Sequence, residues 1–236
     1  MNANAPNVGI GSFRLPIGRG LVALYLAVLT LLGLVVIAAL YPHVPVSTLT
    51  RDMAAIAKVH PLTGVVSNAG VLLWCAAAAI CFFSSSLLRQ QGAQAEARFL
   101  LWSGLLTTLL LVDDFFMVHE YLAPVHFRLN EKVVLASYFC VTAVYLVRHR
   151  HQILQTGYHL LAAALVLFGG SVLLDLADAH GWWVLVEDGC KLLGIASWFG
   201  YHSGRAKYWL VLAPDARTPM TNVASRKDAQ RAQAYR

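Results

Sequence analysis

Six apolar runs divide the chain, and most are close to the length that a helix needs to cross a bilayer. They are long and unbroken rather than alternating, which favours helices over the strands of a membrane barrel. The fourth run is short if it stops at Arg148. The pattern predicts an all-α integral membrane protein with a six-helix transmembrane bundle. The runs cover residues 20–42, 61–88, 99–122, 132–147, 157–179 and 182–202.

Polar segments flank and link these runs. We expect residues 1–19 to form a cytoplasmic N-terminal segment, residues 20–202 the six-span domain, and residues 203–236 a basic cytoplasmic tail. The composition of that tail is typical of disorder. In the link 43–60 we expect a short surface helix around 52–58, with Thr48 or Thr50 as its N-cap.

Composition agrees with a membrane protein. The 236 residues are 58% hydrophobic and 13% charged, whereas a soluble domain usually carries about 25% charged residues. The net charge of +6 does not indicate nucleic-acid binding, because the basic residues gather in loops and tails. We expect membrane lipids as partners. The four cysteines all fall within apolar runs, where they serve as small apolar residues.

Lysine and arginine positions predict the orientation. If the N-terminus is cytoplasmic, thirteen of them lie on the inner side and four on the outer side, with Lys191 inside the membrane. The excess of positive charge on the inner side supports an even number of spans with both termini in the cytoplasm.

The most informative residues are ionisable side chains at membrane depth. Such groups are energetically costly there, and each one is by default a functional hypothesis. The predicted topology gathers them at the outer ends of the third, fifth and sixth runs. They are Asp113, Asp114, His119, Glu120, Asp175, Asp178, His180, Glu187, Asp188 and Lys191.

Lys191 lies four residues after Glu187 and three after Asp188, so it can pair with either carboxylate on one helix. At about 1.5 Å per residue, Lys191 and Asp113 share a similar depth. One lysine cannot neutralise all these carboxylates. The others must be protonated, solvated, hydrogen-bonded or bound to a cation.

The second run contributes polar and small residues near the same end. Ser67 and Asn68 lie there, and Gly64 and Gly70 would allow neighbouring helices to approach closely. We therefore expect the second run to border the charged cluster.

A divalent metal is one hypothesis for this cluster, with zinc the first choice. Carboxylates with a histidine suit zinc, manganese or iron, and a bound metal would activate water for hydrolysis of a lipid-like substrate that enters from the side. The predicted ligands are Asp113, Asp114, His119 and Asp175, with Glu120 or Glu187 as general base and Lys191 as electrostatic partner.

Other functions use the same residues. Carboxylates along an aqueous cavity could relay protons or bind a cation, as in a transporter, and a homo-oligomer would offset the small size. A non-enzymatic structural subunit needs no more than the internal ion pair. Lys191 also matches a retinal-binding lysine, but six predicted spans rather than seven argue against that interpretation.

Two motifs carry a resemblance to known proteins. Residues 113–120 read DDFFMVHE and residues 187–194 read EDGCKLLG, and both resemble strings in uncharacterised bacterial multi-pass membrane proteins. This resemblance implies the bacterial inner membrane and no particular activity. A remoter similarity is to alkaline ceramidases and adiponectin receptors, which implies a zinc hydrolase in which Ser67, Asp113 or Asp114, and His119 take part. The last predicted run has no HxxxH pair.

Overall fold

The computed structural model describes residues 19–41, 45–177 and 180–212, and this part of the chain contains helices and no strands. The chain divides into two compact units, Met1–Thr63 and Gly64–Arg236, which we describe separately. Asp178, most of the predicted N-terminal segment and the predicted tail from residue 213 onward lie outside the described residues.

The first unit holds one long helix and two short ones. The predicted surface helix is present as the last of these, but its N-cap is Asp52 rather than a threonine. The Asp52 carboxylate accepts hydrogen bonds from the backbone N–H groups of Ala54 and Ala55, at 2.8 and 3.3 Å. The helices are α1 (Arg19–Leu40), α2 (Val46–Thr50) and α3 (Met53–Ala57).

The second unit contains five long helices and shorter connecting turns. Four of the long ones, the first four along the chain, are long and apolar enough to cross a membrane, and Leu24–Leu40 of α1 is a shorter apolar stretch. The elements are α4 (Val65–Gln90), α5 (Gln94–Phe116), η1 (Val118–Leu122), α6 (Ala123–Phe127), α7 (Glu131–Leu154), α8 (His159–Leu176), α9 (Trp182–Lys207) and η2 (Tyr208–Leu212).

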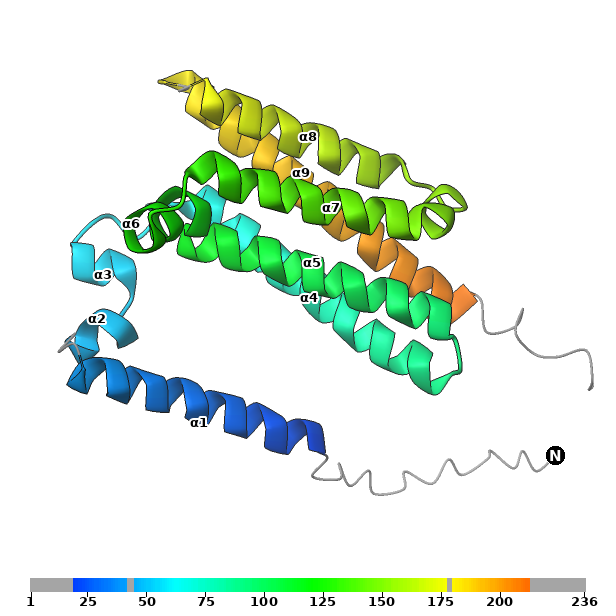
Figure 1. Cartoon of the computed structure of the whole chain (residues 1–236), viewed down its shortest axis with the longest axis horizontal. Coiled ribbons are helices and arrows are strands. Elements are labelled where there is room, and N and C mark those ends of the chain that lie inside the picture. Colours follow the sequence, from blue (N-terminus) through cyan, green and yellow to red (C-terminus); the bar gives the residue numbers. More distant parts are fainter. Residues whose placement is uncertain (1–18, 42–44, 178–179, 213–236) are drawn as a thin grey trace, which may run out of the picture. The chain divides into compact units, whose positions relative to one another are not determined.

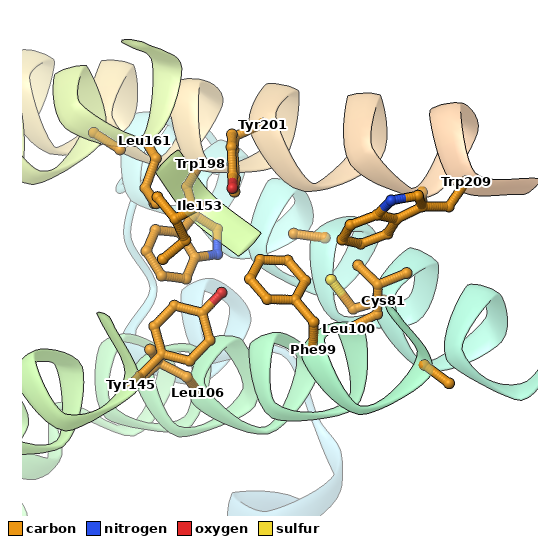
Figure 2. Packing of buried hydrophobic residues seen from close by; sticks show 14 of the residues in the cluster. Cys81, Phe99, Leu100, Leu106, Tyr145, Ile153, Leu161, Trp198, Tyr201 and Trp209 are labelled. Carbon is orange, nitrogen blue, oxygen red and sulfur yellow. The ribbon is translucent and has the colours of Figure 1, made fainter. Parts of the chain in front are cut away.

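The long helices of the second unit lie side by side (Figure 1) and enclose a core rich in aromatic residues. α4 packs against α5 and α9, α8 packs against α9, and α7 packs against α5. Trp198 of α9 is fully buried beside Trp74 and Tyr145, and Phe99 completes this centre (Figure 2). A chain of hydrogen bonds crosses the core. The Tyr145 hydroxyl lies 2.8 Å from Ser103 Oγ and 3.3 Å from Nε2 of the buried His202.

Close helix contacts depend on glycine at three positions. A Cβ on Gly70 would lie 2.9 Å from Ile195 Cδ1, and a Cβ on Gly194 would lie 2.7 Å from the Phe168 ring. A Cβ on Gly104 would lie 2.9 Å from the Phe82 ring. Gly70 therefore allows the close helix approach that the sequence predicted. Gly64 instead has a positive φ of 71° and forms the turn before α4.

Several helix boundaries differ from the sequence-based expectation. The predicted tail does not begin at residue 203, because α9 continues to Lys207 and η2 follows it to Leu212. α7 continues through Arg148 to Leu154, so this helix is longer than the apolar run 132–147 that predicted it. α5 ends at Phe116 instead of running on to residue 122, because Met117 adopts a left-handed conformation with φ 49°. This early end reverses the course of the chain and shapes the site described next.

Candidate functional site

The C-terminal end of α5 folds back on itself and encloses the Asp113 carboxylate. Beyond Met117, the η1 turn brings His119 close to the preceding helix. Asp113 Oδ2 accepts a hydrogen bond from His119 Nδ1 at 2.6 Å, and Oδ1 accepts one from the His119 backbone N–H at 3.0 Å. The hydroxyl of Tyr138 on α7 donates a third, at 2.9 Å. Three donors therefore fix this buried carboxylate, which is 7% exposed.

His119 lies beyond the last residue of the α5 span and links two carboxylates. Its Nε2 is 3.5 Å from Oε1 of Glu120, a residue whose side chain is 50% exposed. Burial acts to lower the pKa of His119, but the hydrogen bond to Asp113 and the negative charges of Asp113 and Glu120 outweigh it. The pKa of His119 is therefore raised above its ordinary value of 6.5.

Lys191 pairs with a carboxylate on another helix. Its Nζ lies 2.5 Å from Asp114 Oδ1, so the ion pair joins α9 to α5. The expected pairing with Glu187 or Asp188 on the same helix is therefore not the contact that the structure shows. Adjacent residues at the end of α5 thus have different partners, Asp113 with His119 and Asp114 with Lys191.

These residues line a partly open cavity of about 190 Å³ inside the second unit. Its charged end lies near the end of α5 and the beginning of α9. Its other end is apolar and aromatic, with Trp74, Phe168 and Trp198 from three helices. Along α8 the lining runs from Leu165 to Asp175, which at about 1.5 Å per residue is roughly 15 Å. The cavity is therefore elongated, with charge at one end.

All seven residues predicted to form the site line this one cavity. They come from three helices and the η1 turn, as far apart in sequence as α5 and α9. Their predicted catalytic and metal-binding roles stay predictions. The residues are Asp113, Asp114, His119, Glu120, Asp175, Glu187 and Lys191.

Negative charge exceeds positive charge at this end. Five of the seven residues are carboxylates and two are basic. The two carboxylates of α5 have close partners, but Asp175 and Glu187 form no ion pair within the described part of the chain. Carboxylates near an apolar cavity favour a proton or an added cation.

A family model for a domain of unknown function, DUF8692, matches residues 22–204. The chain belongs to this family. The match covers α4 to α8 and almost all of α9, so every residue that lines the cavity of this DUF8692 protein lies within it. No curated protein and no solved structure matches the chain.

The residues implied by the resemblance to zinc hydrolases are divided between two cavities that share Asp114 and Lys191. Ser67 lines a smaller cavity of about 30 Å³, together with Asp114 and Lys191, whereas Asp113 and His119 line the larger one. Over residues 19–41, 45–177 and 180–212, no three His, Cys, Asp or Glu side chains are grouped as a metal ion requires. Asp113 and Asp114 are already held by His119 and Lys191. The zinc site therefore stays a prediction, and no step proposed below uses it.

Several residues of the site carry no signal in the sequence. Tyr138 is one of many aromatic residues in apolar runs, and no spacing signal linked it to Asp113. Trp74, Phe168 and Trp198 are ordinary core residues by sequence, and their role in the cavity follows from how α4, α8 and α9 meet. These residues depend on packing between helices, which a single sequence does not display.

Proposed function

We propose that this DUF8692 protein binds a small molecule that carries a positive charge, in a cavity within the outer half of a six-span membrane bundle. The six spans are α1, α4, α5, α7, α8 and α9, with both termini in the cytoplasm. The observation that carries the proposal is the charge of the cavity, whose one end has five carboxylates against one lysine and one histidine.

Charged groups next to apolar walls are energetically costly. A carboxylate beside apolar walls is costly unless a proton, a hydrogen-bond donor or a cation offsets it. Asp113 and Asp114 have such partners, whereas the exposed Asp175 and the half-buried Glu187, both at the charged end of the cavity, remain for a ligand. An ammonium group between these two carboxylates would form an ion pair with them, as the ammonium group of Lys191 does with Asp114. The aromatic end would hold apolar atoms of the same molecule.

The test is ligand binding by the purified protein in lipid nanodiscs. Dodecylammonium should change tryptophan fluorescence, because Trp74 and Trp198 line the cavity, and dodecanol should compete weakly. The double variant Asp175→Asn/Glu187→Gln should weaken ammonium binding by about tenfold or more. Asp188→Asn is the matched control, because Asp188 lines the smaller cavity instead. Equal affinity for the alcohol and the ammonium would contradict the proposal.

Hydrolysis of the bound molecule is a second candidate, and one observation favours it. Asp113 fixes Nδ1 of His119 and leaves Nε2 on the side of Glu120, which is how an oriented general base is held. His119→Gln should then abolish turnover while leaving ligand binding within about threefold of the wild type. Loss of binding and turnover together would assign His119 to binding alone.

Proton-coupled or ion transport and a purely structural role are the remaining predictions. Transport should appear as cation-dependent flux in liposomes that Asp175→Asn reduces. A structural subunit should bind neither dodecylammonium nor dodecanol in the cavity, so the nanodisc titration separates it from the binding protein.

A further inference from the structure

Two neighbouring helices, α7 and α8, both line the cavity, but they do not pack closely against each other. They are consecutive in the chain and joined by a short turn (Figure 1). α7 packs against α5, η1 and α6, whereas α8 packs against α9. Both nevertheless contribute several lining residues. The cavity therefore extends into the space between these two helices.

Two residues lie at the edge of this space. Phe139 on α7 lines the cavity, yet it is 60% exposed, so its ring reaches from the cavity to the outer surface of the helix. Gly169 on α8 also lines the cavity, and a Cβ placed there would meet no atom within 4 Å. Each lies roughly 10–12 Å inward from the outer end of its helix, so they sit at similar depths.

The outer surfaces of these two helices are apolar. Val144 on α7 and Val166 and Leu173 on α8 are strongly exposed, and both helices are long and apolar enough to cross a membrane. An opening between two such helices faces hydrocarbon rather than water. A molecule that passes through it must be soluble in the bilayer.

We infer that the ligand is a single-chain amphiphile with a cationic head, which enters from the bilayer between α7 and α8; this inference rests on the proposed function. The head lies at Asp175 and Glu187, and the chain runs along Phe168 toward the opening. A volume of about 190 Å³ is below the roughly 300–1,000 Å³ of sites that enclose a drug-sized ligand. The rest of the chain therefore remains in the bilayer.

Binding kinetics in nanodiscs test this route. The association rate of a fluorescent dodecylammonium probe should follow its mole fraction in the lipid. Phe139→Ala should speed association and dissociation by about threefold or more, with the dissociation constant little changed. Gly169→Leu should slow both rates by about fivefold or more. Gly170→Leu is the matched control, because Gly170 has equally open space but does not line the cavity.

Methylammonium separates this inference from the proposed function. If methylammonium binds as tightly as dodecylammonium, the site recognises a cation from water. That result would overturn the inference that the ligand is an amphiphile, while the proposed function would stand. Rates that follow the aqueous concentration and ignore Phe139→Ala and Gly169→Leu would overturn the lateral route in the same way. Failure of the wild type to bind any ammonium compound would overturn both.

Discussion

At the scale of single residues, the site is organised around Asp113, because three hydrogen bonds converge on its carboxylate. His119 supplies two of the donors and Tyr138 the third. These contacts tie the η1 turn to α5 and α7. A charge-assisted hydrogen bond stabilises a folded protein by about 1.5–3 kcal/mol, so the cluster contributes to stability as well as to the shape of the cavity.

Asp113→Asn should therefore lower the free energy of unfolding by about 2 kcal/mol, since the amide removes the charge and places a donor beside His119. Thermal unfolding in detergent measures this. Glu120→Gln is the control, because Glu120 is half exposed and lies 3.5 Å from the imidazole, and it should change the free energy by about 0.5 kcal/mol or less. Equal effects of the two substitutions would contradict the central position of Asp113.

The raised pKa of His119 gives a pH dependence of known sign. A group whose pKa is higher in the folded state than in the unfolded state stabilises the fold fully below its ordinary value, here 6.5. That contribution is lost as the pH rises through the folded-state pKa. We expect the melting temperature to fall over the range above pH 6.5, and to fall less in His119→Gln. An unchanged pH profile in that variant would refute the assignment.

At the scale of helices, glycine sets the distance between α8 and α9. Gly194→Ala should be destabilising by about 1–3 kcal/mol, because its Cβ would lie 2.7 Å from the Phe168 ring, which also lines the cavity. Gly189→Ala, five residues earlier on α9, meets no atom within 4 Å and should be neutral or stabilising by roughly 0.5 kcal/mol. Denaturation of both variants in detergent makes the comparison. A neutral Gly194→Ala would show that the two helices are not closely packed there.

The sequence predicted the existence of these helices better than their ends. Apolar length was sufficient for α4, α5, α7 and α8, because a bilayer span leaves a long unbroken signal. It was not sufficient at Met117, where a non-glycine residue with positive φ ends α5. A continuous helix would have turned His119 away from Asp113, so the early end is what allows the two side chains to meet. The gathering of charged residues was predictable from topology, whereas their partners were not.

At the scale of the whole molecule, four helices in the part of the chain that the structure describes have the length and composition of membrane spans, and the strongly exposed apolar side chains fit a lipid environment. The proposed topology adds α1 and α9. It places the α6–α7 connection outside and the α4–α5 turn inside. Arg128 lies in the first connection and Gln91 in the second.

In a cysteine-free background, Arg128→Cys should react with a membrane-impermeant maleimide in intact cells, and Gln91→Cys should react only after permeabilisation. We expect this labelling pattern because lysine and arginine are more frequent on the predicted cytoplasmic side than on the outer side. The reverse labelling pattern would invert the bundle and place the charged end of the cavity in the cytoplasmic half.

The central claim is that a cationic molecule occupies the cavity between the charged residues and the aromatic end. Photo-crosslinking tests it most directly, with an alkylammonium probe that carries a diazirine in its chain and an uncharged alcohol of the same length as the comparison. Mass spectrometry should find the ammonium probe on residues 165–175 of α8 and 187–198 of α9, with labelling lost in Asp175→Asn/Glu187→Gln and kept in Asp188→Asn. Equal labelling by the alcohol, or labels confined to lipid-facing residues such as Val144 and Val166, would contradict the account.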